Sequence, residues 1–291
     1  MNADLLRVEE LLRKHIGAIE IRSVERLGGL TNRTYKVDCV DNIYVVRLPG
    51  EGTEEIIVRQ DEKISTQLAC NLGIDAQLHF FDGESGEKIT DYIVDSVTMN
   101  ADLLKADDNI IKCAEIFKRL HTSGVDTGVP FDVIEMSNTY EDFILRHGGS
   151  FYDDFEEVKK YINSIKLSYM ENVVKVPCHN DALCENWIRQ GDKMYLIDWE
   201  YAGMNDPMWD LADVSIEAGF SEKEDLLFLD SYYGRAVTDK EIEAFMINKV
   251  LIDYLWSLWG KTRAVYDGDE LEEYARVRYA RMKENMQKME G

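Results

Sequence analysis

The segment that decides the fold runs from Cys178 to Ala212 and reads CHNDALCENWIRQGDKMYLIDWEYAGMNDPMWDLA. Two short apolar runs in it flank the turn 190–192, which predicts a β-hairpin that carries Asn186 and Asp198 to neighbouring ends of paired strands. Asp181 lies five residues before Asn186. Phosphoryl transfer needs one carboxylate to accept a hydroxyl proton, and a carboxylate and an amide oxygen to hold Mg²⁺. The alternative, an acidic surface hairpin, requires this spacing and the apolar frame to coincide by chance.

The composition restricts the classes of protein to which the chain can belong. Its 291 residues suffice for one large domain or for two lobes, each with a core. The net charge of −23 argues against nucleic acid and anionic membrane surfaces as partners, and it suits a cationic substrate. No apolar run approaches the roughly 20 residues that a membrane span needs, and the start has no signal-peptide pattern.

The cysteines indicate in which cellular compartment the protein is found. There are five of them, scattered without metal-ligand spacing, which indicates reduced thiols. We therefore expect a cytoplasmic protein that has no membrane span and no nucleic-acid partner. Its oligomeric state, monomer or dimer, stays open.

The central segment resembles a known family. His179, Asp181 and Asn186 are spaced as in small-molecule kinases similar to aminoglycoside phosphotransferases and choline kinases. The runs IDWEYAG (197–203) and NDPMWDLA (205–212) are most similar to the choline/ethanolamine kinases, the bacterial choline kinases in particular. The resemblance covers about residues 25–285. It implies an α+β, bilobed, protein-kinase-like fold, with a five-stranded antiparallel sheet and a helix in the first lobe and mainly helices in the second.

The periodicity of apolar residues places the elements of these lobes. We expect strands at 19–27, 34–40, 43–48, 77–81 and 88–94, and helices at 3–15, 55–72, 107–122, 138–147, 152–171, 239–265 and 269–290. The boundary is expected after residue 93, which gives a nucleotide-binding lobe (1–93) and a catalytic and acceptor-binding lobe (94–291).

A glycine turn between the first two expected strands is a candidate phosphate loop. The run Gly28-Gly29-Leu30-Thr31-Asn32 lets backbone amides approach phosphate oxygens. A plain hairpin turn is the alternative, but the run is similar to the nucleotide loop of choline kinases. The resemblance therefore implies that Gly28, Gly29, Thr31 and Asn32 contact ATP.

Arg47 is a single basic residue inside an apolar strand. If it is buried, it needs an acidic partner, because an unpaired buried charge is costly. The resemblance makes Arg47 the phosphate-binding cation and Glu62, on the next helix, its partner; an edge-strand surface residue is the alternative. The resemblance also gives the Asp91 carbonyl and the Ile93 amide as contacts of the adenine edge.

The resemblance assigns roles within the central segment. Asp181 is the expected catalytic base and contacts the attacking hydroxyl, while Asn186 and Asp198 are the expected Mg²⁺ ligands. Glu200 lies two residues after Asp198 and faces the same way on a strand, so it is either a further metal ligand or a scaffold residue. His179 and Asp210 are expected to hold the catalytic loop in place rather than to react.

Aromatic residues near the C-terminus are candidates for the acceptor site. Trp256 and Trp259 are three residues apart, so they share one helix face, a pattern that by itself is typical of core packing. The runs LWSLWG (255–260) and EYARVRY (273–279) are, however, similar to choline kinases. The resemblance implies a cage of Trp256, Trp259 and Tyr274 for a quaternary ammonium, with Glu217 as its charge partner; each ring contributes on the order of 0.5–2 kcal/mol.

These patterns together predict an ATP- and Mg²⁺-dependent choline kinase. Ethanolamine or another amino alcohol is the alternative substrate, although a primary ammonium favours more acceptors and fewer rings. An aminoglycoside phosphotransferase is the second alternative, and the tryptophan pair argues against it. A non-catalytic, pseudokinase-like binding module would require the loss of Asp181, Asn186 or Asp198, and all three are present.

Overall fold

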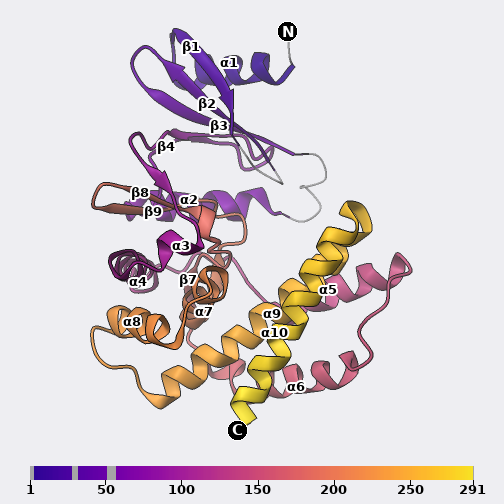
Figure 1. Cartoon of the computed structure of the whole chain (residues 1–291). Coiled ribbons are helices and arrows are strands. Elements are labelled where there is room, and N and C mark those ends of the chain that lie inside the picture. Colours follow the sequence, from indigo (N-terminus) through magenta and orange to yellow (C-terminus); the bar gives the residue numbers. More distant parts are fainter. Residues whose placement is uncertain (1–2, 28–31, 51–56, 291) are drawn as a thin grey trace.

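The computed structural model describes residues 3–27, 32–50 and 57–290, and these form a small and a large lobe (Figure 1). The small lobe contains a five-stranded antiparallel sheet with strand order β1-β2-β3-β5-β4. Its strands are β1 (Ile21–Arg26), β2 (Asn32–Cys39), β3 (Ile43–Pro49), β4 (Leu78–Phe81) and β5 (Lys88–Asp91), and its helices are α1 (Ala3–His15) and α2 (Arg59–Asn71). The expected α+β, bilobed fold with this sheet is confirmed.

The large lobe is mainly helical. Its helices are α3 (Ala101–Leu104), α4 (Asp107–His121), α5 (Val133–Arg146), α6 (Phe155–Ser168), α7 (Pro207–Ala218), α8 (Glu222–Tyr233), α9 (Asp239–Asp267) and α10 (Asp269–Glu290). Two small sheets complete it, one formed by β6 (Val97–Thr98), β8 (Trp187–Gln190) and β9 (Lys193–Leu196), the other by β7 (Val176–Cys178) and β10 (Gly203–Asn205). None of the described helices is long and apolar enough to span a membrane.

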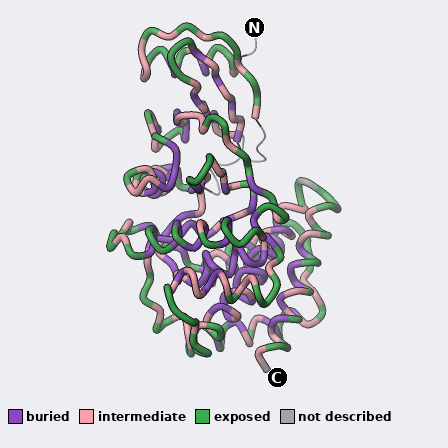
Figure 2. The backbone as a smooth tube through the Cα atoms, turned by 60° about the vertical axis from the view of Figure 1, so that its left-hand side comes forward, coloured by how far each residue is buried: buried purple, intermediate pink, exposed green. Residues whose placement is uncertain are grey.

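The buried apolar residues form two separate clusters. The smaller cluster lies between α1 and the sheet and includes Val8, Leu12 and Val46. The larger cluster fills the interior of the large lobe, where Figure 2 shows most of the buried backbone, and it also includes Ala69 of α2 and Ile74 just after that helix. Helix α2, which Figure 1 shows between the sheet and the large lobe, therefore packs into the core of the large lobe. The boundary after residue 93 stays a prediction.

The predicted hairpin is present, because β8 and β9 pair antiparallel from Trp187↔Leu196 to Gln190↔Lys193. Other boundaries differ from the prediction for local reasons. Helix α5 begins at Val133 instead of 138, because Asp132 caps it by accepting the Ile134 and Glu135 amides at 2.9 and 3.0 Å. The strand expected at 88–94 ends at Asp91.

Two helices of the large lobe extend the sequence-based description. Helix α7 begins at Pro207, with Asp206 as its cap, so Asp210 lies in its first turn. Helix α8 was not predicted. It has a capping box in which Ser221 and Glu224 satisfy each other's backbone amides.

Candidate active site

The loop of residues 179–183, which follows β7 and carries the expected base Asp181, is called the catalytic loop. A carboxylate from α7 holds it in place. Asp210 is fully buried and accepts the backbone amides of His179 and Asn180, both at 2.8 Å. Its Oδ2 atom also lies 3.0 Å from Nε2 of His121. Asn180 has a positive φ of 69°, which is strained for a residue other than glycine. The two amide contacts fix this conformation, as expected for a residue that orients the loop.

His179 joins the catalytic loop to the strand end that carries Asp198. Its Nε2 atom lies 2.9 Å from the carbonyl oxygen of Ile197, and its ring packs edge-on against Trp199 with centroids 4.7 Å apart. Burial lowers the pKa of His179, so the ring stays neutral and donates a hydrogen bond to the carbonyl. This geometry is that of the structural role predicted for His179.

Asn180 is a loop residue whose importance the sequence did not reveal. Its side chain donates to the Tyr201 carbonyl at 3.0 Å and accepts from Nδ2 of Asn205 at 2.9 Å. Trp209 donates its indole N–H to the Asn180 carbonyl at 3.0 Å. The run NDPMWD (205–210) therefore supplies three separate supports for one loop, which explains why its polar and aromatic residues lie so close together in the sequence.

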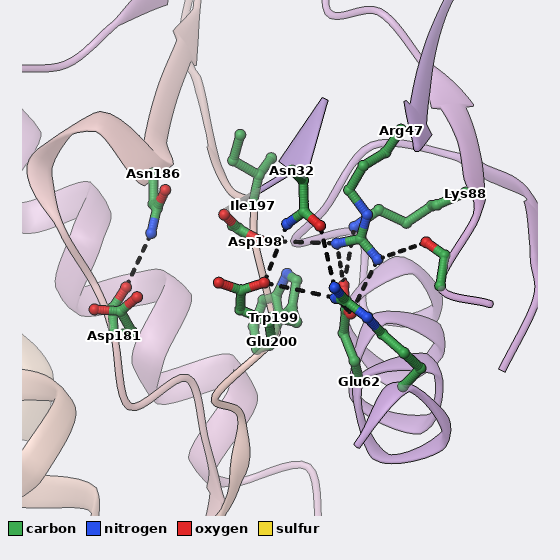
Figure 3. Close-up of polar contacts among 12 residues, drawn as sticks. Asn32, Arg47, Glu62, Lys88, Asp181, Asn186, Ile197, Asp198, Trp199 and Glu200 are labelled. Atoms are coloured by element: carbon green, nitrogen blue, oxygen red, sulfur yellow. Dashed lines mark hydrogen bonds and ion pairs between the residues drawn. The ribbon is translucent and has the colours of Figure 1, made fainter. Parts of the chain in front are cut away.

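The candidate catalytic and metal-binding residues lie together at the end of the hairpin. Asn186 donates its side-chain amide to the Asp181 carbonyl at 2.9 Å, and its own carbonyl accepts the Ile197 amide at 3.0 Å. This second bond brings Asn186 beside Asp198, as the hairpin predicted. In Figure 3, Asp198 and Glu200 lie between the Asp181–Asn186 pair and the residues of the small lobe.

Several carboxylates in this region repel one another. Part of Asp181 is accessible, but burial, together with Asp198 and Glu200, raises the pKa of Asp181 to about 8. Burial and Asp198 likewise raise the pKa of Glu200 to about 7. Carboxylate and amide oxygens are the ligands that Mg²⁺ prefers, and concentrated negative charge stabilises a divalent cation. The donor set of Asn186, Asp198 and Glu200 therefore fits Mg²⁺.

These raised pKa values predict that the metal-free protein loses stability as the pH rises. Unfolded Asp and Glu lose their protons near pH 4, whereas folded Asp181 and Glu200 keep them to about pH 8 and 7. Over that interval the folded state binds more protons, so the free energy of unfolding falls with pH until the folded pKa values are passed. Thermal unfolding between pH 5 and pH 8.5 in a chelator measures this slope.

Two variants give the contrast for this measurement. Glu200→Gln removes one of the titrating groups, so its unfolding temperature should fall less steeply with pH than that of the wild type. Asp153→Asn, at an exposed position, should keep the wild-type slope. Equal slopes for all three proteins would contradict the raised pKa of Glu200.

Arg47 and Glu62 form the buried pair that the sequence predicted. Both terminal nitrogens of Arg47 donate to the Glu62 carboxylate, Nη2 at 2.9 Å. Lys88 lies 3.5 Å from the same carboxylate. Burial alone would raise the pKa of Glu62, but Arg47 and Lys88 outweigh it and hold the pKa at about 2. The role of the pair in nucleotide binding stays a prediction.

Arg47 directs a buried guanidinium toward the candidate metal ligands. Its Nε atom is buried and has no hydrogen-bond partner among the residues that the structure describes. Its Nη1 atom lies 4.0 Å from Asp198, on the side of the candidate metal ligands. An unsatisfied buried donor is costly, and the positive charge of the guanidinium would attract phosphate oxygens held near Asp198. The environment of Arg47 therefore fits a nucleotide phosphate.

Arg59 is a buried cation of this site that the sequence did not identify. It donates to Glu62 at 2.8 Å and to the Asn32 side chain at 3.1 Å, and it lies 3.7 Å from Glu200. A Cβ atom at Gly86 would lie 2.6 Å from Nε of Arg59, so a larger residue there would require the Arg59 side chain to move. The spacing of three between Arg59 and Glu62 on one helix was the available signal.

Glu200 contacts the small lobe as well as the acidic group. Asn32 donates to its carboxylate at 3.2 Å, and Figure 3 shows the two side chains facing each other across the lobes. Gly28, Gly29 and Thr31 lie outside the described residues. Asp91 ends β5 and Ile93 follows it at the junction with the large lobe. The adenine contacts proposed for Asp91 and Ile93 remain predictions.

The aromatic residues expected to bind the acceptor form one cluster. The Trp256 and Trp259 rings meet edge to face with centroids 6.1 Å apart, and Trp259 meets Tyr274 in the same way at 5.9 Å. Tyr201, which the sequence did not single out, contacts Trp256 at 5.4 Å. Because Tyr201 directly follows Glu200, it joins this cluster to the catalytic segment. Trp256 is 5% exposed, so it also belongs to the core.

Glu217, the expected charge partner of the ammonium, is itself paired in the structure. Its carboxylate accepts a hydrogen bond from the buried guanidinium of Arg278, which also donates to Asp253 at 3.3 Å. Asp213, one turn earlier on α7, accepts the Ala182 amide at 2.5 Å, beside the catalytic loop. Glu217 therefore lies near the expected site but is paired, and Asp213, Asp253 and Arg278 are neighbours that the sequence did not reveal.

Comparison with known proteins identifies the family. The family model described as choline/ethanolamine kinase matches residues 24–251. The chain belongs to the choline/ethanolamine kinase family. This membership argues against the aminoglycoside phosphotransferase alternative and agrees with a kinase in which the carboxylates of the central segment serve phosphoryl transfer.

The relatives include both a choline kinase and an ethanolamine kinase. The crystal structure of choline kinase LicA from Streptococcus pneumoniae is 32% identical, with a TM-score of 0.84 over 99% of this chain and 100% of that chain. A crystal structure of LicA in complex with AMP is also 32% identical, with a TM-score of 0.81 over 99% and 100% of the two chains. Ethanolamine kinase 2 of Homo sapiens is 25% identical over an alignment 308 positions long, which covers 94% of this chain and 78% of that protein.

Proposed function

We propose that this kinase transfers the γ-phosphoryl group of ATP to the hydroxyl of choline, with Mg²⁺ as its metal cofactor. The observation that carries the proposal is the cluster of Trp256, Trp259 and Tyr274, which Tyr201 joins to the catalytic segment. Burial raises the pKa of Tyr274, Arg278 lowers it, and the charges of Glu217 and then Asp181 raise it further, so the ring lies in the same electrostatic environment as these carboxylates. A cationic alcohol held by these rings has its hydroxyl within the same region as Asp181.

Each residue of the site has a role in this reaction. Asp181 orients the choline hydroxyl and accepts its proton. Burial and the charges of Asp198 and Glu200 raise its pKa in the metal-free protein, so Mg²⁺ held by those two residues would lower it again and favour the ionised form that a base requires. Asn186, Asp198 and Glu200 would hold Mg²⁺, which neutralises charge on the phosphates when bound. Arg47, kept in position by Glu62, directs its guanidinium toward Asp198 and would place its positive charge beside the phosphates.

The lining of the acceptor site favours choline over ethanolamine. The trimethylammonium group of choline has no N–H donor, so ring faces bind it well. The primary ammonium of ethanolamine has three donors and needs acceptors. One acceptor position of Glu217 is taken by Arg278, and the rings offer the ammonium no lone-pair acceptor. Ethanolamine remains the second candidate substrate, because the family includes ethanolamine kinases.

A substrate panel tests the proposed function. The purified protein is incubated with ATP, Mg²⁺ and one of choline, ethanolamine, thiamine or an aminoglycoside, and ADP release is measured. We expect the highest kcat/KM with choline and no turnover with the aminoglycoside. A higher kcat/KM with ethanolamine than with choline would transfer the proposal to ethanolamine, and no turnover with either amino alcohol would refute it.

Trp259 is the residue of choice for testing the aromatic cluster. Unlike Trp256 it is partly exposed, so its truncation disturbs the core less. Trp259→Ala should raise KM for choline about 5- to 30-fold, since one ring contributes roughly 1–2 kcal/mol when desolvated, and should leave KM for ATP unchanged. Trp259→Phe, which keeps a ring, should recover most of the loss. Equal changes in both KM values would indicate ordinary packing.

The thiols support a cytoplasmic location for this kinase. All five cysteines lie in the described ranges and are free, four of them buried. Free thiols persist in reducing compartments, and ATP is the proposed phosphoryl donor. We therefore infer a cytoplasmic kinase that acts on a small cationic alcohol.

A further inference from the structure

Arg278 lies at the centre of the contacts behind the acceptor site. It projects from α10, and its side chain is 5% exposed. One terminal nitrogen donates to Glu217 of α7, and the other donates to Asp253 of α9 at 3.3 Å. Its guanidinium carbon lies 4.9 Å from the centroid of the Tyr274 ring, over the ring face. One side chain therefore joins three helices and touches two residues of the proposed acceptor site.

The guanidinium is itself held from behind. Asp253 is fully buried and accepts two hydrogen bonds from Arg281, each at 2.7 Å. The contacts thus form one chain of alternating charge, which runs from Arg281 through Asp253 and Arg278 to Glu217. A planar guanidinium with both ends bonded has one orientation, which an ammonium group on a flexible chain would not keep.

Tyr274 is fixed by the same arrangement. A Cβ atom at Gly260 of α9 would lie 2.8 Å from Cδ1 of Tyr274 and 3.2 Å from the Leu271 carbonyl. The glycine therefore lets α10 approach α9 so closely that the tyrosine ring packs against the α9 backbone. Arg278 covers one face of this ring, so the orientation of the ring toward Trp259 depends on the guanidinium.

We propose that Arg278 is a positioning residue for the amino-alcohol acceptor. It holds the Glu217 carboxylate and the Tyr274 ring in one fixed relation, and through them it sets the affinity for the cationic end of the substrate. This inference rests on the proposed function, because it concerns the same acceptor site. It assigns Arg278 no part in nucleotide binding or in the phosphoryl transfer step.

The variant Arg278→Lys tests the proposal, because it keeps the positive charge but removes the planar fork. We expect KM for choline to rise about 10-fold, the effect of losing one hydrogen bond to a charged group, while kcat and KM for ATP stay within about twofold. Arg276→Lys is the matched control. Arg276 lies on the same helix and pairs with Glu273 on the surface, so this variant should behave like the wild type.

A second variant tests the path through Glu217. Glu217→Gln should also raise KM for choline. In the double variant with Arg278→Lys, the fold-increase in KM for choline should be smaller than the product of the two single fold-increases, because both substitutions act on one contact. Strictly multiplicative effects would overturn the coupling, and Arg278→Lys with an unchanged KM for choline would overturn the proposal. Calorimetric titration of each protein with choline gives the dissociation constant independently of turnover.

The outcomes separate this inference from the proposed function. If the wild type neither binds nor phosphorylates choline or ethanolamine, the function itself is refuted, and the inference with it. If the wild type binds choline and Arg278→Lys binds it equally well, only the inference fails. A lower unfolding temperature of Arg278→Lys without any change in KM would show a purely structural role and would also overturn the proposal.

Discussion

Replacing Asp181 with asparagine is expected to reduce kcat with choline by about 10²- to 10⁴-fold, the range that a positioned general base contributes. The amide keeps the shape of the side chain but cannot accept the hydroxyl proton. The backbone supports of the loop, given by Asp210 and Trp209, do not involve the Asp181 side chain, so the fold should persist. A kcat within tenfold of the wild type would contradict the assignment of Asp181.

Nucleotide binding provides the internal check on this variant. Asp181→Asn should bind ATP with nearly wild-type affinity in a calorimetric titration, because Arg47 and Glu62 lie elsewhere in the site. It should also unfold at a higher temperature than the wild type at pH 8 without metal, because it removes a carboxylate that burial and its neighbours disfavour. Asp153→Asn, an exposed aspartate, is the matched control and should change neither quantity.

Arg47→Met is expected to have the second-largest effect. Breaking a buried ion pair leaves a charge uncompensated and costs about 3 kcal/mol of unfolding free energy, the lower end of the usual range, since Arg59 and Lys88 still contact Glu62. KM for ATP should rise at least about 10-fold, because a charge-assisted hydrogen bond contributes roughly 1.5–3 kcal/mol. Urea unfolding and steady-state kinetics measure the two effects.

Two further variants sharpen this prediction. Glu62→Gln removes the carboxylate shared by Arg47, Arg59 and Lys88, so we expect it to destabilise the protein more than Arg47→Met while it raises KM for ATP less. Arg13→Met breaks an exposed pair with Glu9 and should change stability by less than about 1 kcal/mol. An unchanged KM for ATP in Arg47→Met would exclude Arg47 from the nucleotide site.

The features that the sequence predicted correctly depend on local patterns. The β8–β9 hairpin follows from two apolar runs and a glycine turn, and it brings Asn186 and Asp198 together without information from elsewhere in the chain. The partnership of Arg47 and Glu62 follows from the cost of an unpaired buried charge and from the family resemblance. The hairpin needs one physical rule, whereas Glu62 was chosen as the partner by the family resemblance; in both cases the residues lie within about twenty positions of each other.

The features that the sequence did not reveal depend on distant contacts. Arg278 meets Glu217 across 61 positions, and Asn32 meets Glu200 across 168. No periodicity connects such residues. Helix α8 was missed for a different reason: its apolar residues 226–229 are consecutive, which hides the helical period despite the capping signal at Ser221.

The placement of α2 has a consequence for motion between the lobes. Ala69 of α2 packs in the core of the large lobe, whereas Val46, next to Arg47, packs in the separate core of the sheet. The Arg47–Glu62 pair therefore bridges a seam between two independently packed bodies. A rotation of the sheet relative to the large lobe would therefore move Arg47 away from Glu62. Glu62 itself would keep its position relative to Asp198 and Glu200, because α2 packs in the core of the large lobe. The distance between the Arg47 guanidinium and the Glu62 carboxylate would therefore change with the orientation of the sheet relative to the large lobe.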